Sequence, residues 1–405
     1  MSLQGDRPQP DRRIVIAALG VIQILAWGTS FYFPAVFAEP IVADTGWSLG
    51  FVVSGTTIGL LVAGLISPHV GRLIDRRGGR PVLLASSLLY ATGLIGIGLS
   101  PALPLFLLSW VVLGLGMGTG LYDAVFAALG RMYGNEARQP ITNLTLFGGF
   151  ASTICWPLSA FMIEHTGWRI ACLIYAAVHL LVALPIHAAV IRTSPESAPD
   201  AEGTAQQTNA SDNAPVANEK LIFVLLALVM SIAGAVGSVV VVHLLIFLQA
   251  RGVDFAVAVT LGTLFGPAQV GARVIERLFG SRYHPIWTLV ASVTLMALGL
   301  AMLFGAVPAL ILIIVLYGAG YGISWIARGT VPLALFGPVR FPQLMGKLAF
   351  PALIAQALAP SVGAWLIETA GVDATIGVLT LFALINVVLI AALWAMCRAR
   401  LSADL

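Results

Sequence analysis

Charged side chains are concentrated in one short segment, GRLIDRRGGRPVLL, at residues 71–84. Its first ten positions hold four arginines and one aspartate, in a chain whose charged fraction is only 10%. A carboxylate such as that of Asp75 can accept hydrogen bonds from a facing helix amino terminus or an arginine, while glycine permits a tight turn. A solvated basic loop would not need Gly71, Asp75 and Gly78 at these spacings. We therefore expect the segment to dock against another part of the protein.

Two ionisable residues inside apolar runs could carry protons. A charge in hydrocarbon costs at least about 2.5 to 3.5 kcal/mol, so such a residue usually faces a partner or a wet cavity. Asp123 could carry a coupling proton, or it could brace the charged segment by pairing with Arg80 or Arg131. His243 could sense or relay protons, or it could be a hydrogen-bonded packing residue.

Two arginines inside apolar runs could bind an anion. The planar fork of Arg273 suits a carboxylate bidentately, which would make an organic anion the natural ligand. Alternatively, its long side chain could extend to the membrane interface. Arg328 could contact substrate or pair with another helix.

Aromatic side chains could line a path through the protein. Tyr317, Tyr321 and Trp325 recur every four residues, so on a helix they share one face. Ordinary packing or lipid contact is the alternative for such a stripe. A second cluster lies in the segment AWGTSFYF, residues 26–33, where polar residues interrupt an apolar run. The candidate cavity residues are Gln23, Trp27, Ser30, Tyr32, Asn143, Tyr321 and Trp325.

Long apolar runs must position these residues. The chain is 59% hydrophobic with a mean hydropathy of +0.96, far more than a soluble domain needs for one core. A hydrocarbon core of about 30 Å requires roughly 20 apolar residues per helix, and twelve runs of about that length predict twelve transmembrane helices. They span residues 14–38, 47–70, 81–100, 104–128, 140–163, 169–192, 220–249, 255–277, 285–305, 308–330, 344–368 and 372–397.

The distribution of basic residues predicts the orientation in the membrane. If residues 1–13 lie inside, nearly all of the 21 Lys and Arg residues fall on the cytoplasmic side, leaving Arg169 and Arg251 outside. The first run is long and is followed by no small-residue cleavage site, so we expect it to be retained as a helix. The prediction is a cell inner-membrane protein with both termini, including the tail 398–405, in the cytoplasm.

The chain divides into two similar halves. Residues 193–219 are rich in Ser, Pro, Ala, Asn and acidic residues, and predict a disordered linker between halves 14–192 and 220–397. A displacement of about 204 residues reveals weak self-similarity, which is typical of a duplicated unit. The matches are Gly114, Gly116 and Gly118 with Gly318, Gly320 and Gly322; Ile163, Glu164 and Gly167 with Ile367, Glu368 and Gly371; and Asp75-Arg76 with Glu276-Arg277.

The charged segment resembles the loop 2–3 signature of the major facilitator superfamily. The residues that carry the resemblance are Gly71, Leu73, Asp75, Arg76, Gly78 and Arg80. The resemblance covers about 14–397 and implies an all-α fold of two pseudo-symmetric six-helix halves that rock about a central site. It also implies that the signature latches one half against the other when the cavity faces outward.

Within that superfamily, the chain is similar to the monocarboxylate and oxalate/formate porters. Gly79 follows the second signature glycine, the segment 46–55 (GWSLGFVVSG) resembles their entry to helix 2, and His243 with Gly252 flanks the turn between helices 7 and 8. Residues 266–280 resemble their helix 8, which implies that Arg273 holds the substrate carboxylate. Gln269 replaces the acid usual one turn earlier, so the resemblance does not extend to proton coupling through that pair.

These features predict a secondary transporter for a small organic anion such as a monocarboxylate, with protons as the candidate coupling ion. A drug or toxic-compound exporter is the alternative, although residues 155–159 (CWPLS) lack the glycine-rich Gly-Pro motif of proton antiporters. No GxxxxGK[ST], HExxH or GxSxG motif occurs, so we expect no enzyme, cofactor, metal or nucleic-acid partner. The three cysteines receive no chemical role. We expect a monomer in the lipid bilayer; a non-transporting receptor with this fold is a further alternative.

Overall fold

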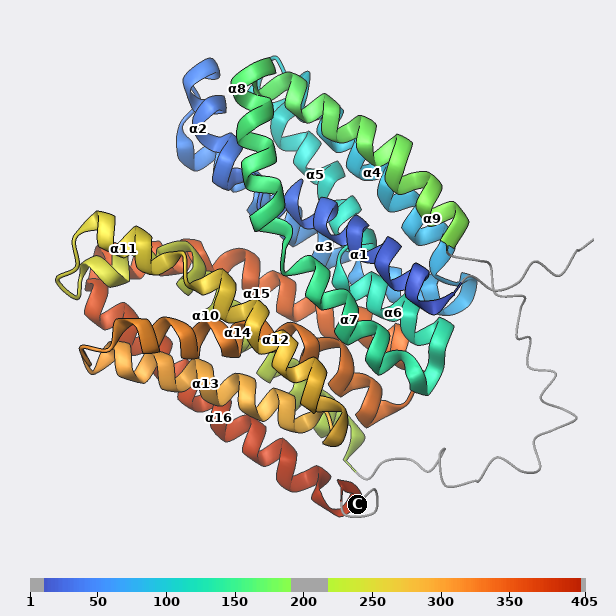
Figure 1. The fold of residues 1–405 in the computed structure, drawn as a ribbon, viewed down its shortest axis with the longest axis vertical. Helices are drawn as coiled ribbons and strands as arrows, with labels where there is room; N and C mark the ends of the chain where they lie inside the picture. Colours follow the sequence, from blue (N-terminus) through green and yellow to red (C-terminus); the bar gives the residue numbers. More distant parts are fainter. Residues whose placement is uncertain (1–10, 191–217, 402–405) are drawn as a thin grey trace, which may run out of the picture.

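The computed structural model describes residues 11–190 and 218–401. Helices and short turns make up the described chain, and no strand occurs within these residues. Figure 1 shows two bundles, α1 to α9 and α10 to α16, which correspond to the two predicted halves. Residues 1–10, 191–217 and 402–405 lie outside the described residues, so the predictions for the linker and the two terminal segments stay untested.

The first predicted span is broken into two helices. The helix α1 (Arg12–Gly28) is followed by a turn at residues 29–33, and α2 (Pro34–Thr45) continues after it. Thr29 and Ser30 donate their hydroxyls to the carbonyls of Leu25 and Ala26, at 2.8 and 2.5 Å. Hydroxyl groups that bond to the backbone, and a proline that lacks an N–H, both compete with a continuous helix.

The charged segment is mostly helical, although the predicted spans 47–70 and 81–100 left residues 71–80 as a loop between them. The helix α3 runs over Leu49–Arg77, and α4 (Gly79–Gly98) begins after a single junction residue. That residue is Gly78, whose φ of +81° is a conformation that glycine adopts without steric cost. Asp75 and Arg76 therefore project from the last turns of α3.

The remaining helices of the first half show two further breaks. The helices α5 (Leu103–Gly120) and α6 (Tyr122–Tyr133) replace one predicted span, with a break at Leu121. After the short turn η1 (Gly134–Ala137) follow α7 (Arg138–Gly148), α8 (Ala151–Val178), η2 (His179–Ala183) and α9 (Leu184–Val190). Gly167 interrupts α8 with a φ of +81° and separates the fifth and sixth spans.

The second half has the same organisation with fewer interruptions. Its elements are α10 (Glu219–Gln249), α11 (Phe255–Gly262), α12 (Phe265–Phe279), η3 (Gly280–Arg282), α13 (Ile286–Phe304), α14 (Leu310–Phe336), α15 (Phe341–Ala370) and α16 (Val372–Leu401). Glycines of positive φ recur in both halves about 204 residues apart, so the backbone shows the repeat that the sequence predicts. The pairs are Gly46 with Gly252, Gly134 with Gly337, and Gly167 with Gly371.

Hydropathy along the described residues agrees with twelve spans. Nine helical stretches there are long and apolar enough to cross a membrane. One of them, Leu103–Val190, contains the fourth, fifth and sixth predicted spans. The first span is missing from the nine because its break leaves α1 with 17 residues. The structure therefore has the predicted twelve-helix, two-half architecture.

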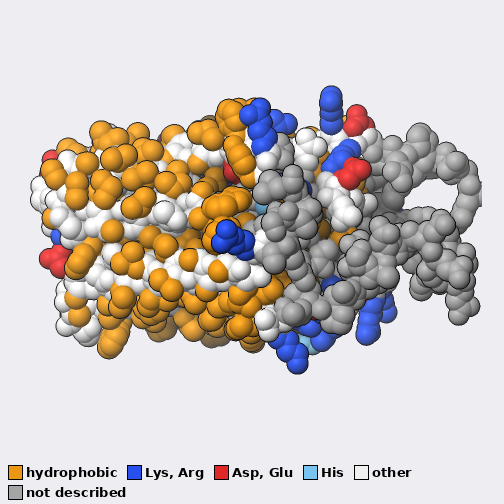
Figure 2. All heavy atoms as spheres, turned by 90° about the horizontal axis from the view of Figure 1, so that it is seen from below, with side chains coloured by type: hydrophobic (Ala, Val, Ile, Leu, Met, Phe, Trp, Pro, Cys, Tyr) orange, Lys and Arg blue, Asp and Glu red, His pale blue; other side chains and the backbone are white. Residues whose placement is uncertain are grey.

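Basic side chains collect at one end of the bundle. We call the end formed by Gly78, residues 134–138, residues 280–285 and residues 337–340 the basic end. Figure 2 shows Lys and Arg side chains gathered at the right of the molecule, while hydrophobic atoms cover most of the visible face to the left. An apolar belt with a charged end is the pattern expected of a membrane-spanning protein.

The two halves are joined along the basic half of the bundle. There α3 and α15 pack so closely that a Cβ added at Gly71 would lie 2.5 Å from the Pro342 carbonyl, and one at Gly346 would collide with the Ser67 carbonyl. Ser67 also donates its hydroxyl to the Gly346 carbonyl at 2.9 Å. At the opposite end, α2 and α11 pack mainly against helices of their own half. The structure is closed at the basic end.

We predict that Gly346→Ala opens the basic end. The added methyl group must push α15 away from α3, because its nearest neighbour is rigid backbone. Spin labels on the exposed positions Arg77 and Val339, introduced as Arg77→Cys and Val339→Cys, should show a distance distribution shifted outward by several ångströms. The matched control is Gly50→Ala in α3, where nothing lies within 4 Å of the added Cβ. An unchanged distribution in Gly346→Ala would show that the seam tolerates a side chain.

Candidate substrate and coupling site

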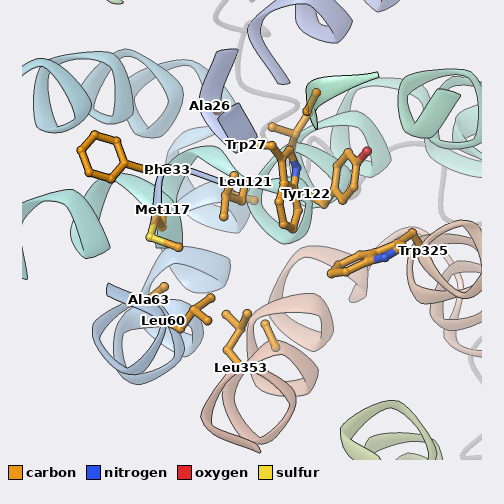
Figure 3. Packing of buried hydrophobic residues seen from close by; sticks show 14 of the residues in the cluster. Ala26, Trp27, Phe33, Leu60, Ala63, Met117, Leu121, Tyr122, Trp325 and Leu353 are labelled. Carbon is orange, nitrogen blue, oxygen red and sulfur yellow. The ribbon is translucent and has the colours of Figure 1, made fainter. Parts of the chain in front are cut away.

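Aromatic rings from both halves meet near the centre of the molecule. The break in the first span places Trp27 at the end of α1, and the break at Leu121 places Tyr122 at the start of α6. Their ring centroids lie 5.1 Å apart, and Trp325 of α14 lies 5.2 Å from Trp27 and 5.7 Å from Tyr122. Figure 3 shows these three rings grouped across the two halves. These distances are favourable for aromatic pairs.

Further rings extend this group, which we call the aromatic layer. Tyr32 lies 6.3 Å from Trp27, and Tyr321 lies 6.1 Å from Trp325, centroid to centroid. Phe265 of α12 lies 5.8 Å from Tyr321. Sequence reasoning identified Trp27, Tyr32, Tyr321 and Trp325 but missed Tyr122 and Phe265. Tyr122 could have been identified from the sequence, because it directly precedes the candidate residue Asp123. The aromatic layer comprises Trp27, Tyr32, Tyr122, Phe265, Tyr321 and Trp325.

Arg273 lies buried between the halves, with only 3% of its surface exposed, and does not extend to the membrane interface. Its Nε donates to the Gly322 carbonyl and its Nη1 to the Thr145 carbonyl, both at 2.9 Å. Its Nη2 donates weakly to Gln269 Oε1, at 3.5 Å. All three acceptors are neutral oxygen atoms, and one of them, Thr145, belongs to the other half.

Glycines make the position of Arg273 possible. A Cβ at Gly322 would lie 2.7 Å from the Cα of Gln269, so α12 approaches α14 closely only because that position is glycine. A Cβ at Gly149 would lie 2.6 Å from Arg273 Nη1. Two contacts place the cation beside the aromatic layer. Tyr122 donates its hydroxyl to the same Thr145 carbonyl at 3.4 Å, and Gly322, which accepts from Arg273 Nε, directly follows Tyr321.

A buried ion pair links the halves beside this layer. Arg328 of α14 donates from Nε and Nη2 to the two carboxylate oxygens of Asp123 in α6, at 2.7 and 2.8 Å. The side chains are 8% and 15% exposed. Asp123 was expected to pair with Arg80 or Arg131, and this expectation is wrong. Its partner is Arg328 of the other half. We call this contact the inter-half ion pair.

Asp75, the predicted latch residue, also contacts the other half. Gln343, in the first turn of α15, donates its amide to Asp75 at 2.7 Å. The carboxylate thus meets a helix amino terminus, as expected, but its side-chain donor is an amide. Arg76 is exposed, Arg80 is half-buried, and Gly71 lies in the α3–α15 seam.

Three candidate residues lie outside the aromatic layer. Asn143 accepts a hydrogen bond from Arg277 Nε at 2.5 Å, near the basic end. Ser30 is fully buried and donates its hydroxyl to the Ala26 carbonyl in the last turn of α1. His243 donates from Nε2 to the Pro360 carbonyl at 3.1 Å, within the second half. In this conformation Ser30 and His243 are therefore each engaged with a backbone carbonyl.

The space among the rings is small in this conformation. A cavity of about 20 Å³, enough for about one water molecule, lies between Trp27, Asp123, Trp325 and Gln356. Trp27 Nε1 and Gln356 Oε1 are buried there without a hydrogen-bond partner among the described residues. No group of three His, Cys, Asp or Glu side chains suitable for a metal occurs in the part of the chain that the structure describes.

Comparison with known proteins gives the family. The model of the Major Facilitator Superfamily matches residues 19–285. The chain belongs to the major facilitator superfamily. It is 26% identical to monocarboxylate transporter 3 of Rattus norvegicus over 374 residues, covering 88% of this chain and 74% of that protein. It is 30% identical to the niacin transporter NiaP of Acinetobacter baylyi over 161 residues, 39% of this chain and 33% of that protein.

Solved structures of this superfamily share the fold. The human organic anion transporter MFSD10 superposes with a TM-score of 0.72 at 16% identity, covering 94% of this chain and 100% of that one. The Escherichia coli fucose:proton symporter FucP gives 0.72 at 14% identity, covering 95% and 99%. The predicted resemblance to a superfamily transporter of the monocarboxylate-like branch is confirmed.

We predict that the inter-half ion pair stabilises this superfamily member only as a pair. Asp123→Asn leaves a buried guanidinium without its counter-charge, which costs about 3–5 kcal/mol, whereas removal of both charges is much milder. Thermal unfolding should therefore show a larger loss for Asp123→Asn than for the double variant Asp123→Asn/Arg328→Gln. Equal, additive losses would mean that the two side chains act independently.

Proposed function

We propose that the protein is a secondary transporter that carries a small organic anion by alternating access. The observation that carries this proposal is Arg273, a buried cation whose hydrogen-bond acceptors among the described residues are all neutral. A buried charge is expensive unless a counter-charge is present, so a substrate carboxylate would stabilise it. The guanidinium fork also matches the carboxylate geometrically.

The contacts of Arg273 suggest how binding and movement are linked. Its Nε bond to Gly322 lies within the second half, and its Nη1 bond to Thr145 crosses to the first half. Separation of the halves at this level breaks the crossing bond and frees a donor. A substrate carboxylate then replaces the Thr145 carbonyl, so substrate binding compensates for the lost contact between halves.

We propose that Asp123 supplies the proton coupling. The neutral Gln269 stands where the related porters have an acid, and the acid–arginine pair of this chain lies across the halves instead. Protonation of Asp123 would neutralise its charge and weaken its hold on Arg328. The basic end could then open. His243, the other candidate, is engaged with a backbone carbonyl inside one half.

The unequal distribution of Lys and Arg residues between the two ends of the bundle supports the predicted orientation in the membrane. Lys and Arg residues of short loops favour the cytoplasmic side, which would make the basic end cytoplasmic in an inner membrane. The described conformation would then be closed toward the cytoplasm. On this proposal the protein works as a monomer with both termini inside the cell.

The names of similar proteins favour an anion over a drug-like cation. The relatives are named as monocarboxylate and niacin transporters, and one solved structure as an organic anion transporter. The central cavity has a largely apolar, aromatic lining, so efflux of toxic compounds is a second candidate function. An affinity screen of carboxylates against organic cations separates the two.

We predict that Arg273→Lys weakens carboxylate binding roughly ten- to a hundredfold. Lysine keeps the charge but loses the planar fork, and a charge-assisted hydrogen bond contributes about 1.5–3 kcal/mol. Arg273→Ala should bind more weakly still. The measurement is the Kd of the purified protein for the best ligand among acetate, lactate, pyruvate and benzoate. Arg277→Lys, one turn closer to the basic end, is the matched control and should bind like wild type. An Arg273→Lys variant of unchanged affinity would exclude Arg273 as the carboxylate anchor.

We predict that Asp123→Asn/Arg328→Gln separates transport from its driving force. In proteoliposomes the double variant should still exchange carboxylate across the membrane, but an imposed pH gradient should no longer cause accumulation. His243→Gln is the control and should keep the response to the gradient. If the double variant accumulates substrate as wild type does, the coupling proton binds elsewhere.

A further inference from the structure

The rings of the aromatic layer already pack on one another across the halves. Trp27 of the first half and Trp325 of the second lie edge to face, 5.2 Å apart with planes at 77°. Tyr122 packs against both rings. When the halves separate, these rings lose aromatic partners. A planar ligand ring would restore the lost contacts, whereas water or an aliphatic chain would not.

We infer that the transported anion is an aromatic monocarboxylate, whose ring lies between Trp27 and Trp325 while its carboxylate binds Arg273. This inference rests on the proposed function and names its substrate class. The layer and the cation are neighbours, because Tyr122 and Arg273 both donate to the Thr145 carbonyl, at 3.4 and 2.9 Å. One compact molecule can therefore reach both.

Arg273 is the arginine available for this role. Arg328 also stands beside the layer, with its Cζ 5.4 Å from the Trp325 ring, but Asp123 holds it through two hydrogen bonds. Arg273 has only neutral acceptors, one of which is lost when the halves part. A single guanidinium group without a counter-charge fits one carboxylate, which favours monocarboxylates over dicarboxylates.

Two unpartnered polar atoms favour a polar substituent on the ring. Trp27 Nε1 is a donor and Gln356 Oε1 is an acceptor, and both residues line the central cavity. A buried polar group without a partner is unfavourable, so a ligand that bonds to it gains affinity. A ring hydroxyl or ring nitrogen would provide such a bond.

The test compares ligands that differ in one property at a time, using calorimetric binding to the purified full chain. Benzoate is the reference, cyclohexanecarboxylate keeps the charge and size without the π-system, propionate lacks the ring, and benzamide lacks the charge. Benzylamine reverses the charge. Benzoate should bind about two- to twelvefold more tightly than cyclohexanecarboxylate, the range expected for one aromatic pair. Propionate, benzamide and benzylamine should bind more weakly still.

Variants tie this preference to the aromatic layer. Trp325→Leu should reduce the benzoate preference over cyclohexanecarboxylate to about one, and Trp325→Phe, which keeps a ring and disturbs packing less, should retain most of it. The matched control is Trp287→Leu, because Trp287 pairs with Trp394 outside the layer and is 47% exposed. The control should keep the full preference.

The outcomes separate this inference from the proposed function. If cyclohexanecarboxylate or propionate binds as tightly as benzoate, the aromatic inference is overturned while anion binding stands. If Trp287→Leu abolishes the preference as Trp325→Leu does, the layer is not its source and the inference fails. If benzylamine or benzamide binds and no carboxylate does, both the inference and the proposed anion transport fail.

Discussion

Inside a bilayer no water is available to a free backbone group, so each interruption of a helix must be compensated by the protein itself. Residues beside the candidate site lie where such compensation occurs. At the first break, the hydroxyls of Thr29 and Ser30 bond to carbonyls of the preceding turn, which allows the chain to change direction beside Trp27. At Pro360 the missing N–H leaves the Gln356 carbonyl free, and Ser238 donates to it at 3.0 Å. His243, like Ser238 a residue of α10, donates to the Pro360 carbonyl, one turn further along α15.

The two seams between the halves differ in chemistry. The α3–α15 seam depends on glycines, and its close fit excludes solvent. The contacts between α7 and the α12–η3 segment are polar: Arg277 bonds to Asn143, Arg273 to the Thr145 carbonyl, and Arg138 to the Gly280 carbonyl. Water can replace polar partners one at a time, whereas a glycine seam separates along its whole length. We expect the polar seam to be hydrated first when the basic end opens.

Much of this architecture could be predicted from the sequence. Runs of apolar residues gave twelve spans, and a displacement of about 204 residues gave the repeat. The polar residues of segment 26–33 marked the place of the first break, but the break at Leu121 could not be predicted, because hydropathy averages over about 20 residues and a short break changes the average little. The charged segment was expected to be a loop between two spans. It is helical to Arg77, since long arginine side chains can reach water from a helix end.

The site was only partly predictable, for a different reason. Residue type and helical spacing identified Arg273, Tyr321 and Trp325 as inward candidates, since these features are local. The partner of Asp123 is 205 residues away, and no local pattern shows which side chain faces it. Asn143 was placed in the cavity because it is polar within a span. Its side chain instead bonds to Arg277.

The position of the inter-half ion pair bears on how the two halves of this chain differ. Asp123 and Arg328 are 205 residues apart, within one residue of equivalent positions in the two repeats. At an offset of 204, Asp123 corresponds to Ala327 and Arg328 corresponds to Ala124, so each charge has an alanine at its equivalent position in the other half. The repeat therefore carries this contact once and not twice, and the two halves are not interchangeable at the point where they are joined.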